Sequence, residues 1–146
     1  MHISEGILSA PVLVTGAGLA ATAVGYSLKK MEHKEVPKVA ILSSVFFVAS
    51  LIHVPVGPSS VHLILNGIIG VLLGWSAFPA ILVALALQGV LFQFGGITTL
   101  GVNTFNMALP AIICFYLFNR GVRSENNFTA LMMAFVCGFL AILLSG

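Results

Sequence analysis

The chain consists of long apolar runs separated by short polar or glycine-rich stretches. Six such runs can be drawn, at residues 7–28, 39–54, 62–75, 78–94, 104–118 and 128–144. No Asp, Glu, Lys or Arg occurs between residues 39 and 119. Because backbone in lipid must satisfy its own hydrogen bonds, runs of this kind are expected to be helices. The pattern predicts an all-α, polytopic transmembrane helix bundle of about six spans.

Composition supports a membrane protein. Hydrophobic residues make up 59% of the chain and charged residues 7%, against about a quarter in an average soluble domain. We expect one domain over all 146 residues. Some runs fall short of the ~20 residues of a straight span, which indicates an end inside a protein-lined cavity or a misplaced boundary. Cys114 and Cys137 lie in apolar runs, so we expect them to pack rather than to form a disulfide.

The basic residues predict the orientation of the chain in the membrane. All six Lys and Arg lie in the stretches 29–38 and 119–127, and cytoplasmic loops collect such residues. If the chain alternates through six runs, both stretches fall on one side and the amino terminus lies outside. Met1-His2, His53 and His62 then share the outer face. A cleaved signal peptide is a weaker interpretation of the first run, because no basic segment precedes it.

The first two residues can chelate a metal ion. The Met1 amine, the His2 amide nitrogen and the His2 imidazole leave one position of a square plane open. His62 is the best candidate for that position, since it follows the break at residues 57–60 and is expected to open the third helix. Asn66 would lie on the same helical face, four residues on. Because the amine and the amide must lose protons, affinity should rise with pH.

Less specific interpretations of the polar residues stay open. A single histidine near the end of a span is more often an interfacial hydrogen-bonding residue than a ligand, and we place His53 mostly in that class. Residues 88–106 mix Gln, Thr and Asn with glycines. This stretch is either a glycine-rich loop with helix caps or a lid whose Asn103 and Asn106 support the ligand imidazoles.

Several functions are excluded by what the sequence lacks. There is no G-x-x-x-x-G-K-[ST] phosphate loop, so the chain cannot drive pumping with ATP by itself, and no familiar serine or zinc hydrolase motif indicates an enzyme. No carboxylate lies within the later runs, so a carried cation must be bound through neutral nitrogen ligands. Such ligands suit nickel or cobalt rather than sodium, magnesium or calcium. A structural or assembly subunit that binds no metal fits the charge-free middle equally well.

Three stretches, MHISEG at 1–6, IHVPVGPSSVHL at 52–63 and FGGITTLGVNTFNM at 94–107, resemble the CbiM/NikM family. Its members are substrate-binding components of energy-coupling-factor (ECF) transporters for cobalt and nickel in prokaryotic cell membranes. The resemblance implies that Met1, His2 and His62 hold the metal ion, with no cofactor beyond the transported Co²⁺ or Ni²⁺. It implies as partners a transmembrane coupling subunit, two ATP-binding-cassette subunits and often a small accessory membrane subunit. Members usually continue for a further membrane helix, so we expect a shortened member or a fragment.

Overall fold

The computed structural model describes residues 3–56, 59–62 and 65–145, with only the backbone described for 53–56 and 59–62. This part of the chain contains six α-helices, two 3-10 helices and one β-hairpin. In chain order the elements are α1 (Ala10–Lys30), η1 (His33–Glu35), α2 (Val36–Ser50), β1 (His53–Val56), β2 (Ser59–His62), α3 (Asn66–Leu73), η2 (Gly74–Ser76), α4 (Ala77–Phe92), α5 (Leu100–Val122) and α6 (Asn127–Ser145). The predicted helical membrane bundle is confirmed, with the hairpin as an unpredicted addition.

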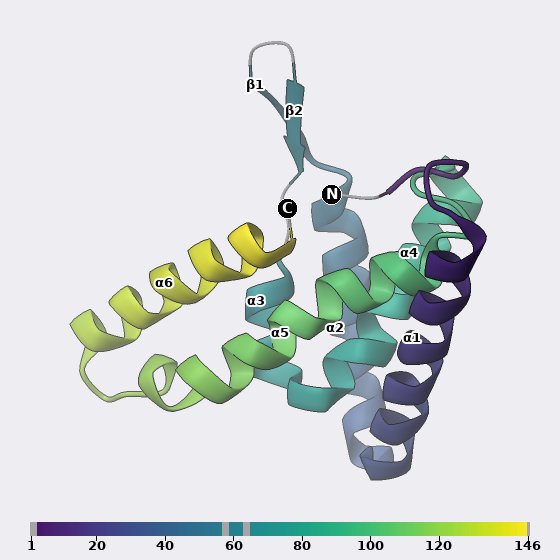
Figure 1. Cartoon of the computed structure of the whole chain (residues 1–146). Helices are drawn as coiled ribbons and strands as arrows, with labels where there is room; N and C mark the ends of the chain where they lie inside the picture. Colours follow the sequence, from purple (N-terminus) through teal and green to yellow (C-terminus); the bar gives the residue numbers. More distant parts are fainter. Residues whose placement is uncertain (1–2, 57–58, 63–64, 146) are drawn as a thin grey trace.

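Helix α5 is the centre of the arrangement. It contacts α1, α3, α4 and α6, with α1 beside its start and α6 beside its second half (Figure 1). The main core cluster combines side chains from α2, α3, α4 and α5, with Phe46, Ile69, Phe78 and Met107 among its largest members. Helix α6 and the second half of α5 extend away from this core as an antiparallel pair (Figure 1).

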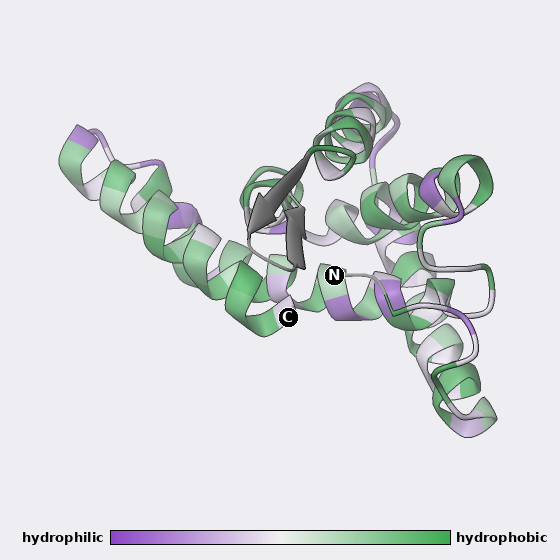
Figure 2. Ribbon diagram, turned by 90° about the horizontal axis from the view of Figure 1, so that it is seen from above, coloured by the Kyte–Doolittle hydropathy of each residue, from purple (hydrophilic) through white to green (hydrophobic). Residues whose placement is uncertain are grey.

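The lengths of the helices bear on the predicted spans. Four helical segments are long and apolar enough to cross a membrane: Ala10–Lys30, Asn66–Phe92, Leu100–Val122 and Asn127–Ser145. The second of these includes α3, η2 and α4. Large apolar side chains stand exposed along the helices, for example Phe135 at 69% and Phe139 at 63% on α6, and the helices consist mostly of hydrophobic residues (Figure 2). This surface suits lipid, whereas the count of six spans stays a prediction.

The third predicted helix begins later than expected. The structure places His62 at the end of β2 and starts α3 at Asn66. The prediction that His62 opens a helix and shares a helical face with Asn66 is therefore wrong. Residues 53–62 are rich in β-branched valine, which favours a pleated strand, and a short apolar run of this kind has no periodicity that separates strand from helix. The second predicted run likewise ends as a helix at Ser50 rather than at residue 54.

A glycine lets α3 cross α5 closely. A side chain at Gly70 would overlap the backbone of Ala111, so glycine at this position permits the close approach of the two helices. Gly74 has a positive φ of 55°, a conformation that glycine adopts without steric cost, and it ends α3. Cys114 and Cys137 are buried free thiols packed between α5 and α6, as predicted.

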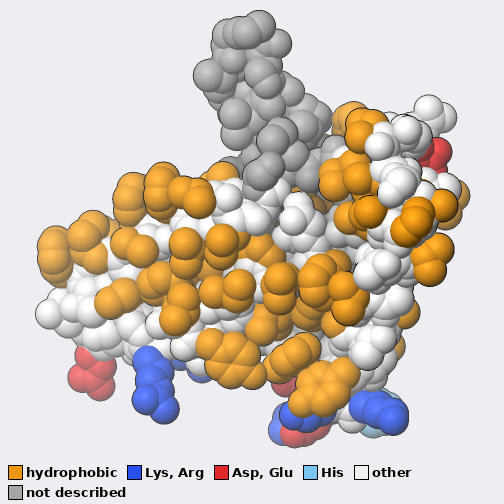
Figure 3. Space-filling model, in the orientation of Figure 1, with side chains coloured by type: hydrophobic (Ala, Val, Ile, Leu, Met, Phe, Trp, Pro, Cys, Tyr) orange, Lys and Arg blue, Asp and Glu red, His pale blue; other side chains and the backbone are white. Residues whose placement is uncertain are grey.

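The two ends of the bundle differ in chemistry. The Lys and Arg side chains gather at one end (Figure 3), which we call the basic end. The hairpin and the first described residues lie at the opposite end (Figure 1), which we call the hairpin end. Both basic stretches therefore share one side, as the alternating pattern predicts. The assignment of the basic end to the cytoplasm stays a prediction.

Candidate metal centre

The predicted ligands come from the start of the chain and from the hairpin. Met1 and His2 lie outside the described residues. His53 and His62 are register partners across the antiparallel pair of β1 and β2, so the backbone brings together two histidines that stand nine positions apart. Within residues 3–56, 59–62 and 65–145, no three His, Cys, Asp or Glu residues form a metal-binding group. Met1, His2 and the side chain of His62 all lie outside what the structure describes, so this ligand set stays a prediction.

Asn103 fixes the residue that follows the predicted terminal chelate. The Ile3 amide donates to Asn103 Oδ1 at 2.9 Å, and Asn103 Nδ2 donates to the Ile3 carbonyl at 3.1 Å. Asn103 is only 2% exposed, and its Nδ2 also donates to the buried Thr99 hydroxyl at 3.3 Å. The two bonds satisfy both polar groups of one backbone residue, which holds the start of the chain against the first turn of α5.

The glycine-rich loop before α5 packs on the same segment. The Thr98 amide donates to Glu5 Oε1 at 3.2 Å. Gly96 has a φ of 152°, and a side chain there would overlap the Glu5 side chain. Thr99 makes no side-chain cap on α5. The structure shows a bond from this loop to the start of the chain and no side-chain cap from Thr99, while the support of the ligand imidazoles by Asn103 and Asn106 stays a prediction.

The other two asparagines predicted as supports hold the end of α6 instead. Asn66 Nδ2 donates to Ser145 Oγ at 2.5 Å, and Asn106 Nδ2 donates to the Ser145 carbonyl at 3.2 Å. Asn66 is fully buried, and it is the first residue of α3, four positions after His62. These bonds tie the start of α3 and the first half of α5 to the end of α6.

A third polar contact lies under the first strand and was not predicted. Gln88 Nε2 on α4 donates to Ser50 Oγ at the end of α2, two residues before the hairpin. Ser50 Oγ in turn donates to the Phe47 carbonyl at 2.7 Å. Gln88 is fully buried. The signal was present in the sequence as a glutamine with apolar residues on its amino-terminal side, although the sequence could not supply its partner.

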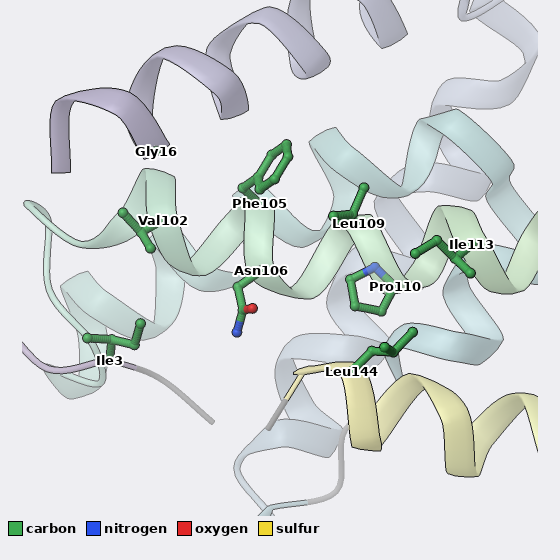
Figure 4. Close-up of a pocket in the computed structure, with 9 residues that line it drawn as sticks. All are labelled: Ile3, Gly16, Val102, Phe105, Asn106, Leu109, Pro110, Ile113 and Leu144. Atoms are coloured by element: carbon green, nitrogen blue, oxygen red, sulfur yellow. The ribbon is translucent and has the colours of Figure 1, made fainter. Parts of the chain in front are cut away.

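An apolar cavity of about 470 Å³ adjoins Ile3 between α1, α5 and α6 (Figure 4). Its lining is Ile3, Gly16, Val102, Phe105, Asn106, Leu109, Pro110, Ile113 and Leu144. Asn106 is the one residue of this lining that has a polar side chain. The cavity therefore lacks the donor set of a metal site, and we place the candidate centre at the hairpin rather than here.

Comparisons with known proteins agree on one family. The family model CbiM, described as cobalt uptake substrate-specific transmembrane region, matches residues 2–146. A putative metal transport protein of Haemophilus influenzae is 52% identical over 125 residues, which cover 86% of this chain and 61% of that protein. A putative fused nickel transport protein NikMN of Archaeoglobus fulgidus is 30% identical over 148 residues, covering 99% of this chain and 49% of that protein.

A solved structure has the same fold. The crystal structure of a truncated transition metal transporter superposes with a TM-score of 0.72 at 27% identity, covering 99% of this chain and 72% of that one. The chain thus spans between about half and two thirds of the length of the two curated relatives.

Proposed function

The chain belongs to the CbiM family, the cobalt uptake substrate-specific transmembrane region, and on that premise we propose that it binds one divalent cobalt or nickel ion for transport. The ion would bind at the hairpin end, on the extracytoplasmic side. Its ligands would be the Met1 amine, the His2 amide and imidazole nitrogens, and the His62 imidazole. The ion is cargo rather than a resident cofactor.

The contact that carries this proposal is the pair of hydrogen bonds between Asn103 and Ile3. A chelate made by the first two residues needs a fixed backbone directly behind it, because ordering a flexible terminus on binding costs conformational entropy. Asn103 supplies that fixed point on the rigid helix α5. The hairpin that carries His62 rises from the same end of the bundle (Figure 1).

Release of the ion on the other side needs partners. The chain contains no phosphate loop for ATP, so energy would come from two ATP-binding-cassette subunits through a transmembrane coupling subunit, as in an ECF-type transporter. A small accessory membrane subunit would complete the assembly. The basic end, with both loops that hold Lys and Arg, would face these subunits in the cytoplasm.

Metal content of the purified chain tests the proposal. We expect about one nickel or cobalt ion per chain, and loss of binding when one residue is added ahead of Met1 or when His62→Ala is introduced. His33→Ala is the matched control. Because His33 lies in η1 at the basic end, this variant should bind nickel or cobalt like the wild-type chain. A folded wild-type chain without metal would favour the alternative, an assembly subunit. Unchanged affinity after the extension would refute the terminal chelate.

A further inference from the structure

An open apolar groove runs along α1 toward the basic end. Its volume is about 450 Å³, and its lining is Leu19, Thr22, Ala23, Tyr26, Trp75 and Phe105. Thr22 offers no free donor to this groove, because its hydroxyl donates to the Gly18 carbonyl of the same helix at 2.7 Å. Helix α1 is long and apolar enough to cross a membrane, so a groove on its surface faces hydrocarbon and suits an apolar chain.

Aromatic side chains from three elements meet at the end of the groove that is nearer the basic end. The Tyr26 ring on α1 contacts the Trp75 ring of η2 edge to face, with 4.9 Å between the ring centroids. Trp75 Nε1 donates to the hydroxyl of Tyr116 on α5 at 3.0 Å. Tyr26 is 42% exposed and Tyr116 is 67% exposed. Tyrosine and tryptophan are enriched where hydrocarbon meets lipid headgroups, so this cluster marks that level of the membrane.

Two hydrogen-bond donors accompany the aromatic cluster. Lys30, the last residue of α1, holds its Nζ 4.7 Å from the centre of the Tyr26 ring. Lys30 makes no ion pair with any residue that the structure describes, and an ammonium has three N–H donors. Tyr116 accepts the bond from Trp75 through its oxygen, which leaves its hydroxyl hydrogen available to an acceptor. Lys30 and Tyr116 interact electrostatically with each other, so a phosphate oxygen placed here meets both donors.

The length of the groove matches one leaflet of a bilayer. Leu19 and Lys30 lie eleven positions apart on α1, which is about 16 Å at a rise of 1.5 Å per residue. Half of the ~30 Å hydrocarbon core is about 15 Å. A lipid with its phosphate at Lys30 would therefore extend an acyl chain along the groove to about the middle of the bilayer.

We propose that the groove binds one anionic phospholipid, with its phosphate between Lys30 and Tyr116 and an acyl chain along α1. A zwitterionic headgroup is disfavoured, because Lys29 adjoins Lys30 and both would repel a choline cation. Of the residues of α1, Ala20 and Ser27 alone are buried, so the lipid would help to hold this helix against η2 and α5. The inference goes beyond the proposed function and does not depend on metal binding.

Fluorescence of the single tryptophan of the chain tests the proposal. Trp75 lines the groove, so an acyl chain that carries bromine atoms should quench its emission on entering. The whole chain is reconstituted in phosphatidylcholine vesicles that contain increasing fractions of a brominated lipid. We expect brominated phosphatidylglycerol to act with about fivefold higher apparent affinity than brominated phosphatidylcholine, which is the effect of about one lysine beside an anionic headgroup.

Two matched pairs of variants locate the lipid. Lys30→Gln should abolish the preference for phosphatidylglycerol, whereas Lys34→Gln, which removes a lysine paired with Glu32, should keep the apparent affinity within about twofold of wild type. Thr22→Phe fills the groove and should reduce quenching by phosphatidylglycerol to the level of phosphatidylcholine. Ala21→Phe introduces the same side chain at an exposed position outside the groove lining, and it should quench like the wild-type chain.

Three results would overturn the proposal. Equal or absent quenching by the two lipids in the wild-type chain would mean that Trp75 meets only the ordinary surrounding lipid or none. The same loss in Lys30→Gln and Lys34→Gln would mean that the basic end attracts anionic lipid as a whole. Reversal of the quenching by inorganic phosphate would assign Lys30 and Tyr116 to a free anion. Nickel takes no part in these measurements, so each of these results leaves the proposed function untouched.

Discussion

Removing the Asn103 side chain should loosen the start of the chain. Asn103→Ala deletes the bond from the Ile3 amide at 2.9 Å and the bond to the Ile3 carbonyl at 3.1 Å. A hydrogen bond of this kind contributes about 0.5–1.5 kcal/mol net, so the two together hold the segment by roughly 1–3 kcal/mol. If metal binding requires the fixed segment, nickel affinity should fall roughly 5- to 150-fold.

Two assays check this reasoning independently. Titration calorimetry with nickel measures the affinity, and hydrogen exchange at the Ile3 amide measures the loss of the anchor without any metal. Asn106→Ala is the matched control, because Asn106 lies one turn along α5 and bonds the Ser145 carbonyl instead. Asn103→Asp keeps the acceptor for the Ile3 amide but loses the donor to the Ile3 carbonyl. It should therefore lose about half of the free energy with which the two bonds hold the segment.

The result that would refute the argument is a folded Asn103→Ala protein with wild-type exchange at Ile3 and nickel affinity within about twofold of wild type. Faster hydrogen exchange at the Ile3 amide with unchanged nickel affinity would show that Asn103 anchors Ile3 but that this anchor does not contribute to metal binding.

Three further predictions concern packing, protonation and ligand binding. Gly70→Ala should lower the free energy of unfolding by about 2 kcal/mol or more, because the new methyl group meets the Ala111 backbone. Gly138→Ala, where a side chain meets no atom within 4 Å, should change stability by less than about 1 kcal/mol, and thermal unfolding in detergent compares the two. Nickel affinity should decrease as pH is lowered below about 7.7–8.0, the usual pKa range of an α-amine, since the Met1 amine must be deprotonated to bind; a pH-independent affinity would exclude the amine as a ligand. Nickel at about 100 times its Kd should stabilise the wild-type chain by about 2.7 kcal/mol and leave the chain extended ahead of Met1 unchanged, as a shift in unfolding temperature would report.

The helices could be predicted because lipid imposes one rule on the backbone. An apolar run without charges has no water to satisfy its amides, so it forms a helix, and all six predicted runs contain one. The rule does not apply to residues 53–62. This segment lies between the end of α2 at Ser50 and the start of α3 at Asn66. Hydropathy alone does not distinguish a short valine-rich strand from the end of a span, and the hairpin was missed for that reason.

Asn66, Asn103 and Asn106 were predicted to support the metal ligands, and that role stays a prediction. Asn103 was identified from its place in a polar, glycine-rich stretch, and it does bond the start of the chain. Asn106 came from the same stretch, and Asn66 came from its spacing four residues after His62; in the structure both bond Ser145. Which amide meets which carbonyl depends on how α3, α5 and α6 cross, and side-chain spacing within one helix carries no information on that. The pairing of Gln88 with Ser50 across α4 and α2 was hidden for the same reason.

The closeness of the start of the chain and the end of α6 affects how the protein should be purified. Ile3 and Leu144 line one cavity (Figure 4), so a polyhistidine tag joined after α6 would place extra imidazoles near the proposed nickel centre. Such a tag would bind nickel itself and give a false stoichiometry, and a tag ahead of Met1 would remove the Met1 amine from the proposed chelate. The exposed turn between α5 and α6, around Ser124 and Glu125, lies at the basic end. A histidine-free epitope inserted there keeps the handle a full bundle length away from the metal.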